Sequence, residues 1–203
     1  MTDDILDERS VDPDPIKQFN LWFKSAVAAG LPLPEAMSLA TVKNDGQPSS
    51  RMVLLKRVDK VGFVFFTNYR SAKAEELEAN PHAALTFFWP QLEKQVRVQG
   101  IVTKTSAAES REYFETRPRE SQIGAWASPQ SQVISGREEL EKRQAELEKS
   151  YSGQAIPWPE HWGGYRLEPD TIEFWKGRIG RLHDRLLYER QSDGTWTIKR
   201  LAP

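Results

Sequence analysis

Four cations lie within ten residues near the end of the chain, beside one tryptophan, one histidine and one aspartate. In chain order these residues are Trp175, Lys176, Arg178, Arg181, His183, Asp184 and Arg185. The whole chain carries 28 basic and 29 acidic residues, so this excess of positive charge is local. A compact cationic group with an aromatic neighbour suits a small, planar, phosphorylated ligand. An exposed hairpin in which Asp184 pairs with an arginine would give the same pattern, and the residues alone leave both interpretations open.

Residues 51–57, with the sequence RMVLLKR, form a second basic segment on a predicted strand. Alternate side chains of a strand share a face, so Arg51 and Arg57 point one way and Lys56 points the other. One face could then meet a cofactor phosphate and the other a substrate. On spacing alone, basic residues exposed at the end of a strand are the simpler interpretation.

Two further segments combine polar groups that bind anions. Residues 71–73, with the sequence SAK, open a predicted helix, where free N–H groups, the helix dipole and a lysine attract negative charge. Tyr113 and Arg117 share one face of another predicted helix, and Ser121 follows at the same spacing. A phenol, a guanidinium and a hydroxyl at one point would bind a phosphate. An ordinary N-cap and a tyrosine–arginine stack on the surface are the alternatives, and the patterns alone favour them.

The composition excludes several kinds of chemistry. The chain has no cysteine, so redox chemistry must come from a cofactor. Its histidines, His82, His161 and His183, lack metal-ligand spacing, so no metal site is expected. A net charge of −1 argues against binding to nucleic acid. The acidic start does not resemble a secretory signal and no apolar run approaches about 18 residues, so we expect a cytoplasmic protein without a membrane span.

The chain begins with an acidic stretch, after which helical and strand patterns alternate. Residues 1–15 hold six acids and one arginine, which predicts a mobile tail. Ser106 with Glu109, and Ser135 with Glu138, have the spacing of capping boxes. Together with the apolar periodicity, these signals predict helices over 16–29, 71–80, 106–117 and 135–150.

Alternating apolar residues predict a sheet of many antiparallel strands. The strands are expected over 36–43, 49–58, 61–67, 83–89, 94–105, 163–168, 171–176, 185–190 and 195–201. A sheet of this extent removes its exposed edges by closing into a barrel. We therefore predict a single domain over 16–203, mainly β with flanking helices (α+β), built as a small antiparallel β-barrel.

Short motifs occur in a fixed order along the chain. They are RMVLLK at 51–56, FFTN at 65–68, QVRVQG at 95–100, YFETRPRESQIGAWAS at 113–128, QS at 130–131, WGGYRL at 162–167, IEFW at 172–175, RLHDR at 181–185 and RLAP at 200–203. From about Ile16 to Pro203 the chain thereby resembles the pyridoxine/pyridoxamine 5′-phosphate oxidase family. So many ordered matches are very specific, above all RLHDR after IEFW with RPRESQIGAW upstream.

The resemblance implies an FMN-binding split β-barrel homodimer with two FMN sites at the subunit interface. Arg51 is implied near the FMN phosphate. The implied FMN contacts are Arg51, Met52, Val53, Leu54, Leu55, Lys56, Phe66, Thr67, Lys73, Gln95, Gln130, Ser131, Trp175 and Arg185. The implied substrate contacts are Lys56, Tyr113, Arg117, Ser121, Arg181, Leu182 and His183. Among these, Arg181 and His183 are implied as catalytic residues at the pyridine ring and its reacting side.

The reaction implied by the resemblance is oxidation of pyridoxamine 5′-phosphate and pyridoxine 5′-phosphate by O2 to pyridoxal 5′-phosphate. A hydride passes from C4′ to flavin N5, H2O2 is released, and the amine substrate also yields NH3. The chain departs from the family at Ala72, where an arginine is often found. One contact to the FMN phosphate is therefore expected to be missing, and Arg70 is the nearest possible replacement.

Two alternatives to this activity are open. One is another FMN split-barrel oxidoreductase, such as a flavin reductase or a phenazine-pathway oxidase, which should lack the group formed by Tyr113, Arg117 and Ser121. The other is a non-catalytic carrier of FMN or pyridoxal phosphate, which would bind its ligand and release no peroxide.

Overall fold

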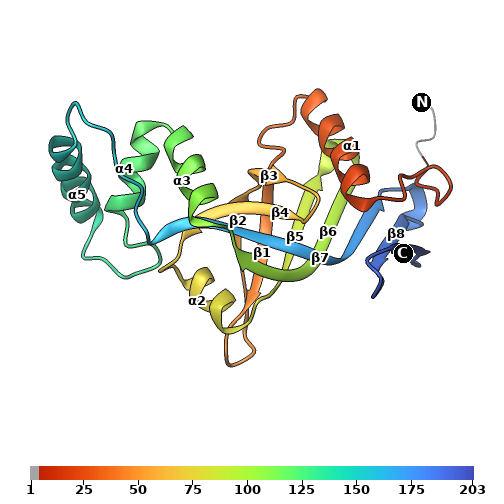
Figure 1. Cartoon of the computed structure of the whole chain (residues 1–203). Helices are drawn as coiled ribbons and strands as arrows, with labels where there is room; N and C mark the ends of the chain where they lie inside the picture. The colour runs from red at the N-terminus through yellow and green to blue at the C-terminus, as the bar shows by residue number, and fades with distance from the viewer. Residues whose placement is uncertain (1–4) are drawn as a thin grey trace.

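The computed structural model describes residues 5–203, and residues 1–4 lie outside the described part. Within residues 5–203, nine strands form one antiparallel sheet in the order β2-β1-β5-β6-β7-β4-β3, with β8 beside β7 and β9 beside β8 (Figure 1). The strands are β1 (Ala36–Val42), β2 (Pro48–Leu54), β3 (Arg57–Val58), β4 (Phe63–Asn68), β5 (His82–Trp89), β6 (Lys94–Lys104), β7 (Trp162–Lys176), β8 (Asp184–Arg190) and β9 (Trp196–Arg200). The helices are α1 (Pro15–Ala28), α2 (Ala72–Ala79), α3 (Ala107–Thr116), α4 (Arg119–Ala127) and α5 (Arg137–Ser150). The predicted fold class, mainly antiparallel β with flanking helices, is confirmed.

Helix α1 packs an aromatic face against the sheet. Its first turn is capped by Asp14, whose carboxylate accepts a hydrogen bond of 2.9 Å from the backbone N–H of Ile16. Phe19 is fully buried, and its ring centroid lies 4.9 Å from those of Phe63 on β4 and Phe87 on β5. Burial of one such side chain stabilises the fold by about 1.5–3 kcal/mol. These contacts join the N-terminal helix to strands from the middle of the chain.

Strand β7 is longer than the sequence predicted. The two strands expected at 163–168 and 171–176 are one strand that runs past Pro169. The proline is accommodated because β7 bulges beside it: Gly100 of β6 pairs with Pro169 and Gln99 pairs with Thr171, so Asp170 is left without a register partner. A Cβ at Gly100 would lie 1.9 Å from the carbonyl oxygen of Glu168, so this close approach requires glycine. One continuous strand therefore connects the two ends of the molecule.

Helices α3, α4 and α5 gather at one end of β7, and β8 lies at its other end (Figure 1). The sequence did not predict α4, because Pro118 was expected to end the helical segment. Pro118 is instead the N-cap residue of α4, a position that needs no N–H donor. This helical group has a small apolar core of its own, formed by Phe114, Ile123, Ile156 and Trp162.

The two predicted capping boxes have different outcomes. The box of α3 is confirmed, since the Ser106 hydroxyl accepts from the Glu109 N–H at 3.1 Å and the Glu109 carboxylate accepts from the Ser106 N–H at 3.2 Å. The prediction of a capping box of Ser135 with Glu138 is wrong. Ser135 lies before the N-cap of α5, and its N–H donates to Glu139 at 3.1 Å.

The acidic N-terminal segment makes specific contacts with the end of the chain. Leu6 is 5% exposed, and its carbonyl accepts a hydrogen bond of 2.8 Å from Arg200. Arg200 also donates to Glu8 at 2.7 Å. The prediction of a mobile tail over 1–15 is therefore corrected for its described part, because Leu6 is buried and Glu8 pairs with a cation that lies far away in the sequence.

Candidate active site

One cavity of about 550 Å³ brings together side chains from segments far apart in the sequence. It lies among β2, β4, α2, α3 and the loop after α4. The predicted residues that line it are Met52, Val53, Leu54, Lys56, Phe66, Thr67, Lys73, Tyr113, Arg117, Ser121 and Gln130. Eleven of the implied cofactor and substrate contacts therefore converge on one site.

Lys73 forms the positive wall of this cavity at the start of α2. Its ammonium donates to the hydroxyls of Thr67 and Ser71, both at 3.1 Å, and to the side-chain oxygen of Gln130 at 2.9 Å. Burial, and next the nearby positive charge of Arg51, lower the pKa of Lys73 to about 8. An anion at this point would favour the charged form of Lys73, so the site is suited to a phosphate beside the N-terminus of α2.

Arg51 and Leu55, two members of the predicted cofactor strand, do not line the cavity. The guanidinium of Arg51 donates to the Glu76 carboxylate at 2.8 Å and to the Ser49 hydroxyl at 2.6 Å, and it also bonds Thr41. Leu55 is 6% exposed and belongs to the main core. Strand alternation does not explain both positions, because Val53 shares their face and lines the cavity; the hydrogen bonds of Arg51 and the burial of Leu55 keep these two side chains out of it. Their direct contact with a cofactor stays a prediction.

Arg117 also lines the cavity, and one nitrogen of its guanidinium has no hydrogen-bond partner in the described part of the chain. Its Nη1 atom is buried and has no hydrogen-bond partner among residues 5–203. The guanidinium lies 4.4 Å from the ring centroid of Trp162, a cation–π contact, and burial lowers the pKa of Arg117. Buried polar groups are nearly always hydrogen-bonded, so this donor is available to a ligand in the cavity that Lys56, Tyr113 and Ser121 also line.

Aromatic rings stack behind the two cationic walls. The rings of Phe66 and Tyr113 lie 4.0 Å apart with an interplanar angle of 24°, and Trp162 stacks on Phe66 at 5.4 Å. Gly164 permits this arrangement, because a Cβ there would lie 2.9 Å from Phe66 and 2.5 Å from the Thr105 hydroxyl. The spacing alone favoured a surface stack of Tyr113 on Arg117. In the structure Tyr113 stacks on Phe66 instead, and the guanidinium of Arg117 lies over the ring of Trp162.

Trp162 and Glu76 are site residues that the sequence analysis did not identify. Trp162 opens the motif WGGYRL, which the analysis used for the resemblance without giving this tryptophan a role. Glu76 neutralises Arg51 behind Lys73. The local sequence around Glu76 does not predict its ion pair with Arg51, because that pair depends on how α2 packs against β1 and β2.

A charged network fixes α3 on the sheet. Arg166 of β7 donates to Asp59 at 2.8 Å and to Glu109 at 3.0 Å, and Arg57 also pairs with Glu109. Glu109 is the capping-box residue one turn before Tyr113. The network therefore sets where α3 presents Tyr113 to the cavity.

The remaining predicted residues form a second group at the far end of β7. Gln95, Trp175 and Arg185 are register partners on β6, β7 and β8. Arg185 donates to Glu173 at 2.8 Å, and the ring of His183 lies 4.7 Å from that of Trp175. The loop before β8 exposes Leu182 (75% accessible) and Arg181, which has a left-handed backbone with φ of 62°. Ser131 is exposed and left-handed, with φ of 71°, in the loop that carries Gln130.

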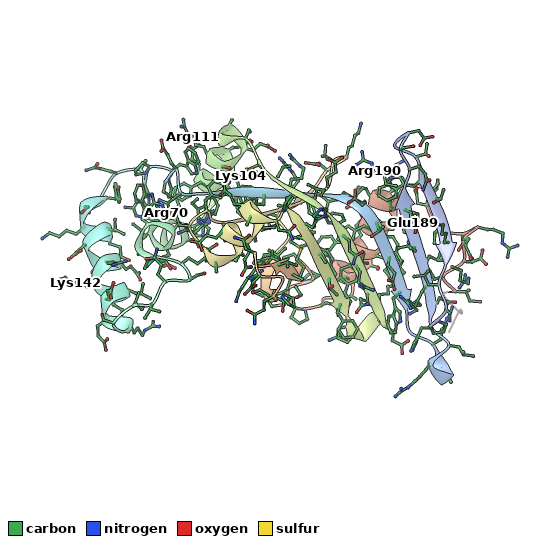
Figure 2. All side chains as sticks on the ribbon, turned by 90° about the horizontal axis from the view of Figure 1, so that it is seen from below. Arg70, Lys104, Arg111, Lys142, Glu189 and Arg190 are labelled. Atoms are coloured by element: carbon green, nitrogen blue, oxygen red, sulfur yellow. The ribbon has the colours of Figure 1, made fainter. Side chains whose placement is uncertain are left out.

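The two groups cannot meet within one chain. Trp162 and Trp175 stand near opposite ends of β7, roughly 40 Å apart at about 3.3 Å per residue. Arg70, beside the start of α2, and Glu189, on β8, lie far apart along the molecule (Figure 2). Arg181 and His183 therefore lie outside the cavity of their own chain.

Other features of the described residues do not compete with this site. A larger groove of about 980 Å³ lies between α1 and the β8–β9 hairpin, lacks every predicted site residue, and mixes acids with bases, such as Asp14 with Lys17. Among residues 5–203, no three potential metal ligands lie together. None of the helices they form is long and apolar enough to cross a membrane.

Comparison with known proteins agrees with this geometry. A family profile described as "Pyridoxamine 5′-phosphate oxidase" matches residues 23–151, and one described as "Pyridoxine 5′-phosphate oxidase C-terminal dimerisation region" matches residues 162–203. A relative from Rubrobacter xylanophilus, named pyridoxine/pyridoxamine 5′-phosphate oxidase, is 57% identical over 98% of this chain and 91% of its own length. A relative of the same name from Burkholderia vietnamiensis is 58% identical over 98% and 93%.

Solved structures show the same fold. PhzG from Burkholderia lata, in complex with tetrahydrophenazine-1-carboxylic acid, superposes with a TM-score of 0.92 at 32% identity over 98% of both chains. An FMN-binding protein from Nostoc punctiforme superposes with a TM-score of 0.74 at 19% identity over 91% of this chain and 97% of its own. The fold and the cavity thus define a split-barrel oxidoreductase that uses a flavin. The chain belongs to the pyridoxine/pyridoxamine 5′-phosphate oxidase family.

Proposed function

We propose that the protein uses FMN and O2 to oxidise pyridoxamine 5′-phosphate and pyridoxine 5′-phosphate to pyridoxal 5′-phosphate. With the amine substrate, O2 and water are consumed, and H2O2 and NH3 are released. The relatives' shared name and the arrangement of the cavity support the proposal. A cytoplasmic location stays a prediction.

The observation that carries the proposal is the orphaned guanidinium nitrogen of Arg117. A substrate phosphate at this point accepts from Arg117, from Lys56 and from the hydroxyls of Tyr113 and Ser121, which line the same cavity. Charge-assisted hydrogen bonds of this kind each contribute about 1.5–3 kcal/mol. The substrate is thereby anchored through its phosphate, which takes no part in the reaction. Other residues can then orient the substrate ring.

The opposite wall fits the phosphate of FMN. Lys73, Thr67 and Gln130 converge there beside the N-terminus of α2, and the side-chain oxygens that accept from the Lys73 ammonium are neutral, which suits the addition of an anion. Arg51 is paired with Glu76, and its positive charge is the second cause, after burial, of the lowered pKa of Lys73. When bound, FMN supplies the hydride acceptor of the reaction.

The residues of the second group act on the reacting side of the substrate. Arg181 orients the C4′ substituent and offsets negative charge there. It does not act as a base, because a guanidinium stays protonated. His183 forms a hydrogen bond to the substrate ring. Trp175 provides a flat apolar wall next to His183.

A homodimer completes the site, because the second group lies too far away along β7 to reach the cavity of its own chain. The C-terminal residues 162–203 match a dimerisation region. An apolar groove of about 560 Å³, lined by Leu33, Phe88 and Met52, adjoins the cavity, since Met52 lines both. These three side chains are 63%, 57% and 64% exposed, and a second copy would cover them.

An oxygen-electrode assay with the FMN-loaded protein tests the proposal. We expect O2 uptake and equal H2O2 release with pyridoxamine 5′-phosphate, and much slower uptake with unphosphorylated pyridoxamine. Binding without peroxide would identify a non-catalytic carrier. The similarity to PhzG makes tetrahydrophenazine-1-carboxylic acid the necessary comparison substrate, and preferential oxidation of that acid would refute the proposal.

A further inference from the structure

Asp184 and Arg200 belong to the motifs RLHDR and RLAP, and the site described above gives neither a role. Asp184 accepts from Arg178 Nε at 2.7 Å and from Arg200 Nη1 at 3.0 Å. The backbone N–H of Arg178 donates in turn to His183 Nδ1 at 3.1 Å. A line of contacts thus runs from the last strand to the histidine of the second group.

The contact at His183 defines which ring nitrogen carries the proton. A backbone N–H is always a donor, so Nδ1 must be the acceptor and must be unprotonated. In a neutral imidazole the proton then resides on Nε2, and that nitrogen becomes a donor. The tautomer of a histidine is inferred from such partners and decides what it offers a ligand.

Asp184 holds Arg178 in the conformation that makes this contact. The carboxylate is 16% exposed and lies between two guanidinium groups. Burial opposes its charge, but the hydrogen bond and charge of Arg178, with a further bond from Arg200, outweigh burial and lower the pKa of Asp184. Each oxygen of the Asp184 carboxylate accepts a hydrogen bond, Oδ2 from Arg178 and Oδ1 from Arg200.

The N-terminal segment closes the line of contacts. Arg200 donates through Nε and Nη2 to the two carboxylate oxygens of Glu8, at 2.9 Å and 2.7 Å, and through Nη2 to the carbonyl of Leu6. Two acids from opposite ends of the described chain, Glu8 and Asp184, thus share one arginine.

We propose that Asp184 is a positioning residue that, through Arg178, keeps His183 in the Nε2–H tautomer, so that His183 presents a hydrogen-bond donor to its ligand. Glu8 supports this arrangement by holding Arg200. The inference rests on the proposed function only in that the ligand of His183 is the substrate ring. The tautomer itself is a property of the free protein.

Nitrogen-15 NMR of the histidine-labelled, FMN-loaded protein in alkaline buffer tests the tautomer directly. His82→Gln and His161→Gln variants identify the signals of His183. We expect Nε2 to be protonated and Nδ1 unprotonated in the wild type, and a mixture of tautomers in Asp184→Asn. A wild-type His183 protonated on Nδ1 would overturn the proposal, and so would an unchanged single tautomer in Asp184→Asn.

Kinetics with pyridoxamine 5′-phosphate then separate positioning from general loss of structure. We expect kcat/KM to fall about tenfold in Asp184→Asn, the size of one ordinary hydrogen bond, and less in Glu8→Gln, which leaves Asp184 in place. The matched control is Glu189→Gln, which removes the Glu189–Lys199 pair between the same strands, β8 and β9, without touching Arg178. Its kcat/KM should stay at the wild-type value.

Two results distinguish this proposal from the proposed function. If Glu189→Gln lowers kcat/KM as much as Asp184→Asn does, the effect is one of hairpin stability and the positioning role is refuted. If the wild type shows the Nε2–H tautomer and the mixture appears in Asp184→Asn, the inference stands even where pyridoxamine 5′-phosphate is not oxidised, and the proposed function alone fails.

Discussion

The ammonium of Lys73 lies 2.9 Å from the side-chain oxygen of Gln130, across 57 positions of sequence. This contact joins the start of α2 to the loop after α4. The Lys73 ammonium also donates to the hydroxyls of Thr67 and Ser71, so its side-chain acceptors are neutral oxygens. Burial, followed by the field of Arg51, lowers the pKa of Lys73 to about 8. The charge of this wall of the cavity can therefore be titrated in an accessible pH range.

We expect the affinity for FMN to be about tenfold lower at pH 9 than at pH 7, because only about a tenth of Lys73 is protonated one unit above its pKa. Fluorescence titration of the apoprotein measures this affinity. Riboflavin, which lacks the phosphate, should show no such loss. Lys73→Arg should bind FMN with a flat profile, since arginine stays protonated, and an equal decline in that variant would contradict the assignment.

The same lowered pKa affects the stability of the FMN-free protein. Between about pH 8 and the ordinary lysine value of 10.5, the unfolded chain binds the Lys73 proton and the folded chain does not. The contribution of Lys73 to the free energy of unfolding therefore rises with pH across this window. Urea unfolding of the wild type and Lys73→Met at pH 7.5 and pH 10 measures it, and a difference between the two proteins that does not change with pH would contradict it.

Replacement of Arg117 by methionine should lower kcat/KM for pyridoxamine 5′-phosphate about a hundredfold, mainly through KM, because charge-assisted bonds to the phosphate are lost. The free energy of unfolding should not fall, since the variant removes a buried donor that has no partner. Arg111→Met is the matched control on the exposed face of α3 (Figure 2). Wild-type activity in Arg117→Met would show that the substrate phosphate does not bind at Arg117.

A site shared between two chains predicts complementation. Arg117→Ala and Arg181→Ala should each be nearly inactive. When equal amounts are unfolded and refolded together, half of the dimers are mixed, and each mixed dimer holds one intact site. We expect about a quarter of the wild-type activity per chain. A mixture with no more activity than the separate variants would show that both arginines act within one chain.

Ala72 is exposed at the first position of α2, where the family often carries arginine. An arginine there should reach a phosphate bound beside Lys73. We expect Ala72→Arg to bind FMN about tenfold more tightly, the effect of one charge-assisted hydrogen bond. Ala72→Gln controls for the added bulk, and equal gains in the two variants would contradict a role for charge.

Two glycine substitutions should have opposite effects on stability. Gly164→Ala brings a Cβ within 2.9 Å of Phe66 and 2.5 Å of Thr105, so we expect a loss of about 1–3 kcal/mol and weaker flavin binding as Phe66 shifts into the cavity. Gly124→Ala, in α4, meets no atom within 4 Å and should gain about 0.5–1 kcal/mol. Chemical unfolding measures both, and a neutral Gly164→Ala would show that the ring stack tolerates displacement.

Local patterns predicted most elements of the fold, because strand alternation and helix capping depend on neighbouring residues. Helix α4 was missed because Pro118 ends one helix and also caps the next. The long strand β7 was divided in two because Pro169 is accommodated in a strand here beside a bulge at Asp170, which the sequence did not reveal. Both errors arise at a proline: at Pro118 one residue serves two helices, and at Pro169 pairing with the distant strand β6 continues the strand.

By itself, the order of motifs in the sequence determined the family and the chemical types of the groups that meet the ligands. The tertiary structure decided which groups share a cavity. It joins Lys73 to Gln130, turns Arg51 toward Glu76, and leaves Arg181 at the far end of β7. The reason is that chain spacing sets only the face a side chain occupies on its own element. The register and packing of the sheet, set by burial of apolar side chains from distant segments, determine which faces meet.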